Sequence, residues 1–542
     1  MNRNRFLGET LPMSTTTAPP QPTRPSRSGI PRGFAALLGL LAVGAAIGVG
    51  HLVAGLVAPS SSPYLAVGDT VIRFSPQWLT EFAKATFGLA DKAVLLTGMG
   101  VVIAVVAALA GLASRRRSTP GVAVVAVLGV LGVLAVLLAP VFAPLGLIAP
   151  VVSLAVGVGV FGWLHAQALR TYDAAEPGSP TQVSRRNVLI GSSAAVGVAS
   201  LGAGAGGQAL VGGVEDSRGT VTEQLAQARL AERAPAIPPD AAFPELGTPT
   251  FLTPNPDFYR IDVALRIPSQ AAADWSMRIH GMVDKEVTLT FDDLLKRPLV
   301  ERTITMTCVS NEVGGNLIST ANFVGVDLRE LLLEVGLRPE ATQLYTTSID
   351  GWYTSTPTDV VMQEGRGALL AIGMNGEALP PVHGFPVRMV VPGLYGYVSA
   401  TKWITDMEVT RFDAPGKQSY WLERNWAERA PIKTQSRIDS PRGFASVPAG
   451  KVTVAGIAWS QPTGISKVEV RTDGGPWQQA ELATEVNLDT WRMWRTEFDL
   501  APGSHTVQTR ATDRNGVTQT EMRADPIPDG ASGWPATIFT VA

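Results

Sequence analysis

The sequence contains a single cysteine, Cys308, among 542 residues. One thiol forms no disulfide within its own chain, and it excludes an iron–sulfur cluster held by four thiolates and a CxxCH haem attachment. The formal net charge is −2, so the chain lacks the basic excess of a nucleic-acid-binding protein. We therefore expect no iron–sulfur cluster and no nucleic-acid partner.

Long apolar runs, in contrast, are abundant in the first 212 residues. Pro, Ser, Thr and Arg dominate 1–31, which predicts a disordered cytoplasmic tail. In 32–212 we expect a transmembrane region, because each apolar run approaches the ~20 residues of a membrane-spanning helix. Their Gly and Ala content suits close helix packing in a membrane. The five runs are approximately 33–57, 93–114, 119–140, 146–168 and 188–212.

Arginine clusters beside these runs predict how the chain crosses the membrane. They precede the first run and follow the second and the fourth, which the positive-inside rule assigns to the cytoplasm. Everything after 212 is then extracytoplasmic, in a multi-pass protein of the cell membrane. Arg185 and Arg186, in SRRNVLIG, also resemble a twin-arginine export signal, although ordinary flanking charge explains them equally well.

Histidine is scarce too, and only His51 and His165 lie in the apolar runs. His51 lies late in an outward-running segment and His165 lies late in an inward-running one. At ~1.5 Å rise per residue, the two side chains approach opposite membrane faces. We therefore expect no haem held by two histidines, and we expect membrane lipid or a membrane partner around these helices.

The rest of the chain has the patterns of a soluble protein. We interpret 213–248 as a linker with a helix near 220–233. In 249–436 short strands mix with helices, such as one that begins at Phe291 and one that stops at Gly336, which predicts an α+β domain. In 437–542 apolar and polar residues alternate between turn signals, which predicts an all-β immunoglobulin-like sandwich of ~100 residues with an interaction role.

Cys308 ends a strand-like run, TITMTC, in which Ile304, Met306 and Cys308 share one face. A lone cysteine on such a face is usually a small buried hydrophobe. The polar and glycine-rich SNEVGGN follows at once, however, so the thiol also lies where a loop opens. A thiolate there suits a redox metal.

Three stretches in order closely resemble bacterial members of the sulfite oxidase family of molybdopterin enzymes: TCVSNEVGGNLISTANFVGVDL, HGFPVRMVVPGLYGYVSATKW and YWLERNWAERAPIKTQSRIDSP. The resemblance covers about 250–542. It implies a sulfite-oxidase-like molybdopterin domain and a dimerisation-type sandwich, which leaves a homodimer open. It also implies one molybdenum–molybdopterin per chain, with Cys308 as the thiolate ligand of the metal.

The resemblance also implies the remaining site residues. Arg260 matches an arginine that binds the anionic substrate, so it joins Cys308 as a catalytic candidate. Such polar and cationic groups suit the phosphate and the ring atoms of a pterin. We interpret Arg266, Arg429 and Arg437 as surface charges. The implied cofactor-binding residues are Phe258, Tyr259, Arg260, Asp350, His383, Arg388, Ser399, Thr401 and Lys402.

Two departures from the family pattern put sulfite itself in doubt. Trp426 stands where sulfite oxidases place a tyrosine near the metal, and Ile261 and Asp262 replace Asn and His after the anion-binding arginine. We expect oxygen-atom transfer on a small oxyanion or sulfur-containing substrate. Because the resemblance does not extend to the haem domain of animal sulfite oxidases, electrons pass to or from a separate carrier, a cytochrome or a membrane redox partner. Reduction of a sulfoxide and a non-catalytic, membrane-tethered binding protein are the alternatives.

Overall fold

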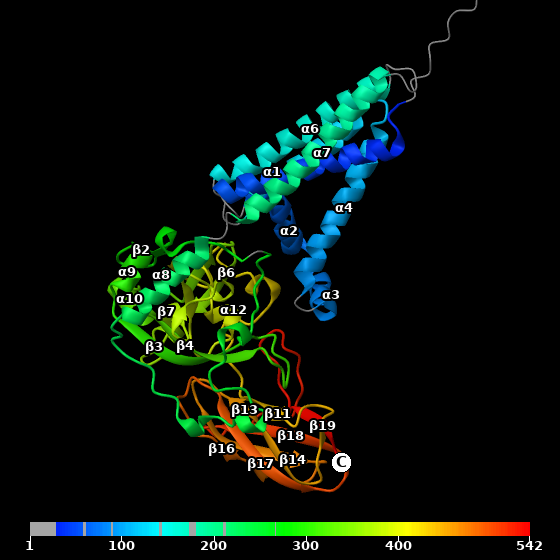
Figure 1. Cartoon of the computed structure of the whole chain (residues 1–542). Coiled ribbons are helices and arrows are strands. Elements are labelled where there is room, and N and C mark those ends of the chain that lie inside the picture. Colours follow the sequence, from blue (N-terminus) through cyan, green and yellow to red (C-terminus); the bar gives the residue numbers. More distant parts are fainter. Residues whose placement is uncertain are drawn as a thin grey trace, which may run out of the picture.

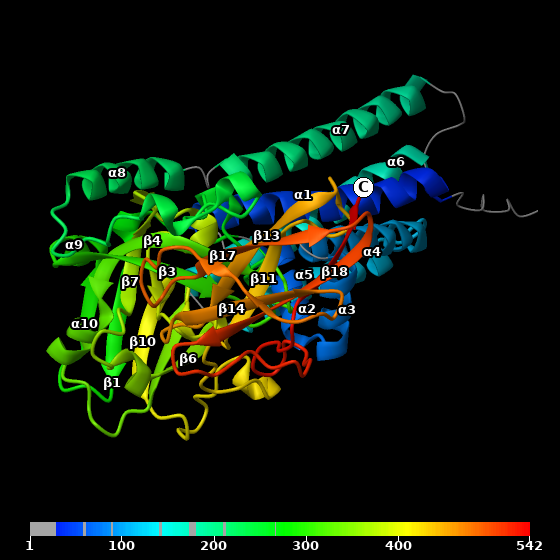
Figure 2. The ribbon, with the colours of Figure 1, turned by 90° about the horizontal axis from the view of Figure 1, so that it is seen from below.

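The computed structural model describes residues 29–57, 61–87, 90–139, 144–172, 180–209, 213–265 and 267–542. Figure 1 shows a helical bundle, an α/β domain beneath it and a β-rich domain at the far end. Figure 2, seen from below, shows α7 (Pro180–Ala209) leading into α8 (Gly213–Gln227) along one side of the molecule. Most of the predicted cytoplasmic tail lies outside the described residues.

Among the described residues, five helices are long and apolar enough to cross a membrane. Glycine lets the first of them approach its neighbours closely: a Cβ on Gly39 would lie 1.9 Å from the Ala107 carbonyl oxygen, and one on Gly48 would lie 2.3 Å from that of Ser200. The prediction of five long apolar helices is confirmed, although 140 and 210–212 lie outside the described residues. The helices are α1 (Arg32–Val57), α4 (Asp91–Ala113), α5 (Thr119–Leu137), α6 (Ile148–Tyr172) and α7.

Two shorter helices, which the sequence analysis does not predict, connect α1 to α4. They are α2 (Pro63–Phe74), which has Pro63 at its first position, and α3 (Gln77–Phe87). This connection places the start of α4 against the α/β domain, where Lys92 Nζ donates to the Ala264 carbonyl oxygen at 2.6 Å.

The α/β domain contains two sheets. The first has the order β2-β1-β10-β5-β6, with β1 (Ser276–Gly281) parallel to β10 (Ile404–Thr410). The second has the order β3-β4-β7-β8, and β9 (Arg388–Val390) also pairs with β7. The remaining strands are β2 (Val287–Thr290), β3 (Leu299–Thr307), β4 (Ile318–Asp327), β5 (Gln343–Ser348), β6 (Tyr353–Pro357), β7 (Leu369–Met374) and β8 (Glu377–Ala378).

The predicted helix boundaries in this domain are confirmed. Helix α9 (Phe291–Leu295) starts behind Thr290, whose hydroxyl and backbone form a capping box with Asp293. Helix α10 (Leu328–Glu334) stops before Gly336, which has a φ of +71°. Two further short helices are α11 (Thr358–Val361) and α12 (Gly396–Ser399).

The segment after the bundle differs from a simple linker. Helix α8 starts at Gly213 and ends at Gln227, earlier than expected, and Val221 is buried in the core of the α/β domain. Arg218 Nε donates to the Leu379 carbonyl oxygen at 3.0 Å. The segment is therefore packed against the domain that it precedes.

The C-terminal region is β-rich, as predicted. Its two sheets have the orders β11-β13-β17-β16 and β12-β19-β18-β14-β15, and they share a core that includes Val454, Trp494 and Phe539. Trp459 and Trp491 instead join the core of the α/β domain. The strands are β11 (Gln435–Ser440), β12 (Ser446–Val447), β13 (Gly450–Trp459), β14 (Ile465–Thr472), β15 (Gln478–Gln479), β16 (Glu481–Leu482), β17 (Arg492–Leu500), β18 (Gly503–Asp513) and β19 (Ala536–Val541).

Strand β3, which leads to Cys308, is held from this C-terminal region. The backbone N–H of Thr305 donates to the Asp489 carbonyl oxygen at 2.9 Å, and its hydroxyl accepts from the backbone N–H of Trp491 at 2.8 Å. Gln461 Nε2 donates to the Thr305 carbonyl oxygen at 3.1 Å. The strand is thus fixed three residues before the cysteine.

Candidate functional site

Cys308 lies directly after β3 and is 8% exposed. Its backbone N–H donates to the Leu317 carbonyl oxygen at 3.0 Å, and its own carbonyl oxygen accepts from the N–H of Asn311, also at 3.0 Å. Asn311 Oδ1 accepts from the N–H of Leu317 at 2.8 Å. The loop that follows the cysteine is therefore closed on itself, which fixes the backbone at Cys308.

Phe258 and Tyr259 connect this cysteine to the second predicted motif. The two rings stack with centroids 5.4 Å apart, and Phe258 meets His383 edge to face at 5.3 Å. Burial raises the pKa of Tyr259, and the nearby Cys308 thiolate raises it further, whereas Arg388 lowers it. The Tyr259 hydroxyl lies beside Gly396, 3.5 Å from where a Cβ of that residue would stand. Phe258, Tyr259 and His383 therefore lie close together.

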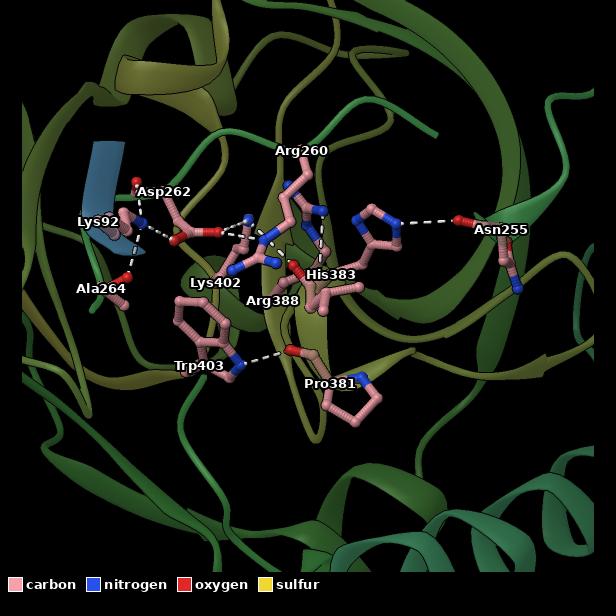
Figure 3. Close-up of polar contacts among 11 residues, drawn as sticks. Lys92, Asn255, Arg260, Asp262, Ala264, Pro381, His383, Arg388, Lys402 and Trp403 are labelled. Carbon is pink, nitrogen blue, oxygen red and sulfur yellow. Dashed lines mark hydrogen bonds and ion pairs between the residues drawn. The ribbon is translucent and has the colours of Figure 1, made fainter. Parts of the chain in front are cut away.

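His383 is buried and neutral. Burial, Arg388 and Lys402 lower its pKa to about 3. Its Nε2 donates to the Asn255 carbonyl oxygen at 3.1 Å, so the neutral ring carries its proton there and offers Nδ1 as an acceptor. Figure 3 shows the cationic side chains on one side of the ring and Asn255 on the other.

Arg388 is buried in the same place, 2% exposed. Its Nη1 donates to the His383 carbonyl oxygen at 3.1 Å and its guanidinium lies 5.9 Å from the ring centre of Phe323. Burial lowers its pKa to about 10. No described residue accepts a hydrogen bond from its Nε. Burying a guanidinium with an unused donor costs free energy unless an anion or another acceptor takes a hydrogen bond from it.

Lys402, Asp262, Arg260 and Lys92 form one charged cluster (Figure 3). Asp262 Oδ2 lies 3.3 Å from Lys402 Nζ and 2.8 Å from Arg260 Nε, while its Oδ1 lies 2.7 Å from Lys92 Nζ. Lys402 also donates to the Val382 carbonyl oxygen at 3.0 Å. Although burial opposes ionisation, these cations hold the pKa of Asp262 well below its usual range. One carboxylate therefore faces three cations.

The other predicted residues are placed differently. Asp350 accepts from Ser348 and lies near Asp262 and Lys402, and its pKa is raised chiefly by burial. It borders a cavity of about 210 Å³ between α2 and the α/β domain, together with Asp69. The hydroxyls of Ser399 and Thr401 are engaged inside the protein, with the Leu394 carbonyl oxygen at 3.0 Å and with Thr346 at 2.7 Å. These two side chains therefore support the fold of the loop.

Comparisons with known proteins show the family of this chain. A family described as "Oxidoreductase molybdopterin binding domain" matches residues 264–421. The uncharacterized oxidoreductase YuiH of Bacillus subtilis is 34% identical over 151 residues, which are 28% of this chain and 71% of that protein. The mitochondrial sulfite oxidase of Macaca fascicularis is 31% identical over 306 residues, or 48% of this chain. The chain belongs to the sulfite oxidase family of molybdopterin-binding oxidoreductases.

This sulfite oxidase family member spans about half the length of the curated sulfite oxidases that it matches, 55% of the Macaca protein and 54% of the one from Rattus norvegicus. Among solved structures it is similar to the sulfane dehydrogenase SoxCD from Paracoccus pantotrophus, with 23% identity and a TM-score of 0.48 over 57% of this chain and 88% of that chain.

The residues present fit the molybdenum–molybdopterin group that the family implies. Within the described residues, the unused buried donors include Thr307 Oγ1 on the cysteine strand, Asn311 Nδ2 on the loop after it and Arg388 Nε in the second motif. The cations exceed the carboxylates, as a phosphate-bearing group requires. His383 offers an acceptor for a ring N–H. The site therefore offers a thiol for the metal at one end and cations for the phosphate at the other.

Sequence analysis missed Lys92 and Asn255. Lys92 starts a membrane-length helix, where a lysine is usually a flanking charge, and only the α2–α3 connection turns it toward the site. Arg437 is not the surface charge that we expected, because its side chain is 12% exposed and its Nη1 donates to the Gly315 carbonyl oxygen of the cysteine loop at 3.2 Å. Arg429 is half-exposed and paired with Asp359, as a surface charge is. Arg266 lies outside the described residues.

Proposed function

We propose that this chain is a membrane-anchored oxidoreductase that transfers an oxygen atom to a small sulfur-containing substrate and exchanges electrons with a separate carrier. The observation that carries the proposal is the buried, incompletely satisfied Arg388 beside neutral His383, with Tyr259 near both Arg388 and Cys308. When bound, the molybdenum–pterin group supplies the oxygen-atom and two-electron chemistry.

The chain's own residues hold that group and the substrate. Cys308 would supply the thiolate for the metal, and the hydrogen bonds at the end of β3 hold its backbone in place. Arg388 and Lys402 would bind the phosphate of the pterin, and Nδ1 of neutral His383 would accept a hydrogen bond from a pterin ring N–H. Arg260, whose side chain is 42% exposed, is free to turn from Asp262 toward an anionic substrate and hold it for reaction.

A molybdenum assay combined with a substrate screen tests this function. We expect about one molybdenum per purified chain, and oxidation of sulfite or a related sulfur compound with a soluble acceptor such as ferricyanide. A metal content far below one per chain would instead favour a non-catalytic binding protein. Turnover only with a sulfoxide and a reduced dye would favour the reverse reaction.

One observation favours that second activity. Trp426 is buried, stacks on Trp421 with centroids 4.0 Å apart, and no described residue accepts from its Nε1. A tyrosine hydroxyl at this position would donate a hydrogen bond to an oxyanion, whereas an indole provides no hydroxyl, which suits a neutral sulfoxide better. Trp426→Tyr is therefore expected to shift the ratio of the two activities toward the oxyanion.

The domain limits and the topology belong to the same proposal. We infer a transmembrane region at 32–212, an oxidoreductase domain at 249–436 and an immunoglobulin-like, dimerisation-type domain at 437–542, with both outer domains extracytoplasmic. The arginine clusters support this orientation. Reporter fusions after residues 212 and 117 test it, because the two positions should report opposite sides. Replacement of Arg185 and Arg186 by lysine tests the export signal.

A further inference from the structure

A groove of about 890 Å³ runs through the bundle beside α1. From α1 it is lined by Leu40, Gly44, Gly48 and His51, which recur at helical spacing on one face. Between Leu40 and His51 the groove extends about 16 Å along the helix axis at ~1.5 Å per residue. Its volume lies in the range of a pocket for a ligand of drug size.

The two ends of the groove differ in chemistry. Leu40, Leu41 and Ile47 make its length largely apolar, and α7 adds Leu201 between the small residues Gly197 and Gly204. His51 and Tyr64 lie at the other end. His51 Nδ1 is 3.2 Å from Ser62 Oγ, and in the tautomer in which Nδ1 accepts from Ser62 the ring proton lies on Nε2. Tyr64 donates to the Leu96 carbonyl oxygen.

The polar end touches the segment that carries the cofactor cluster. Leu265 lines the groove, and a Cβ on Gly68 of α2 would lie 2.7 Å from its Cδ1. Three residues earlier, Asp262 binds Lys402 and Arg260, and Lys92 of α4 is bonded to both Asp262 and Ala264. The groove and the proposed redox site are therefore joined through one short stretch of chain.

We propose that this groove binds a lipid-soluble quinone, with its ring at His51 and Tyr64 and its isoprenoid tail along Leu40 and Leu41. A lipid acyl chain would fill the apolar length but would make no use of the polar end. This inference rests on the proposed function. Sulfite and water give sulfate, two protons and two electrons, and the same two electrons and two protons convert the two ring carbonyls to hydroxyls, so the exchange balances.

The chain offers a clean variant to test the site. Gly44 lines the groove, and a Cβ on it would meet no atom within 4 Å, so the side chain of Gly44→Leu starts in open space and adds bulk to the groove. Gly159 of α6 also has open space within 4 Å and does not line the groove, which makes Gly159→Leu a matched control in another membrane helix. His51→Phe removes the polar end while it keeps a ring of similar size.

The experiment uses the full chain, loaded with molybdenum cofactor, in detergent. An azido-quinone with a short tail is photolysed with it, and labelling of α1 and α7 is measured by mass spectrometry with and without decyl-benzoquinone as competitor. We expect competed labelling that falls about tenfold in Gly44→Leu and in His51→Phe and stays within about twofold in Gly159→Leu. In parallel, each variant is assayed with ferricyanide and with decyl-benzoquinone as the acceptor.

The two acceptors separate this inference from the proposed function. Loss of quinone reduction with ferricyanide turnover retained in Gly44→Leu supports the groove as the quinone site. Labelling that decyl-benzoquinone does not compete, or that Gly44→Leu leaves unchanged, shows a lipid or a partner helix in the groove and overturns the inference. Absence of turnover with ferricyanide in the unaltered protein overturns the proposed function, whereas the labelling result still decides whether a quinone binds.

Discussion

Lys92 Nζ, in the first turn of a membrane-length helix, lies 2.7 Å from Oδ1 of Asp262, whose other oxygen binds Lys402 and Arg260. A single carboxylate thus joins the bundle to the two cations that we assign to the cofactor and the substrate. Asp262 therefore connects the charged cluster to the helices of the bundle.

Lys92→Met is expected to weaken this connection. The pair is largely buried, and Lys92 also donates to the Asp262 and Ala264 carbonyl oxygens, so its loss should cost about 1–3 kcal/mol of unfolding free energy for the α/β domain. Because Asp262, the carboxylate that binds Arg260, loses one of its fixed partners, KM for an anionic substrate should change more than kcat. Lys296→Met, at an exposed lysine 3.9 Å from Asp293, is the control and should change neither.

Cys308→Ser is expected to leave the fold intact and remove the metal. The cysteine packs as a small buried residue, so the folding cost should be about 1 kcal/mol. Molybdenum per chain and the melting temperature measured on the same preparation check this. Full molybdenum retention with unchanged turnover would show that the thiol is not a ligand.

Arg388→Met should have opposite effects on the stability of the protein with and without cofactor. In the cofactor-free protein the guanidinium is buried with an unused donor and no carboxylate among its described contacts, so a methionine of similar length should leave stability unchanged or raise it by about 1–2 kcal/mol. In the loaded protein the same change removes an anion contact and should speed release of the pterin. Melting curves of both forms measure the two signs; equal destabilisation of both would make Arg388 a purely structural residue.

The sequence predicts the local elements and fails on long-range placement. Helix starts and stops at Thr290 and Gly336 follow from capping chemistry that acts within a few residues. The engagement of Ser399 and Thr401 with other parts of the chain, and the burial of Arg437 against the Gly315 carbonyl oxygen, depend on strands and loops distant in sequence. Lys92 is the clearest case, because the α2–α3 connection that brings it to Asp262 has no motif of its own.

The pH dependence of stability should reveal Lys402. Burial and Arg388 lower its pKa to about 8 from the model-peptide value of 10.5, although Asp262 opposes the shift. Between these two values the unfolded chain holds a proton that the folded, cofactor-free chain has released, so the unfolding free energy should rise as the pH rises. The gain should be about 1–3 kcal/mol by pH 10 and should be absent below pH 7.

Denaturant melts of the cofactor-free protein at intervals from pH 7 to 10 measure it, and Lys402→Met should flatten the curve. An anion that binds the protonated lysine should also flatten the curve of the unaltered protein, because it raises the folded-state pKa toward the unfolded one. A slope that persists in Lys402→Met would assign the titration to another group.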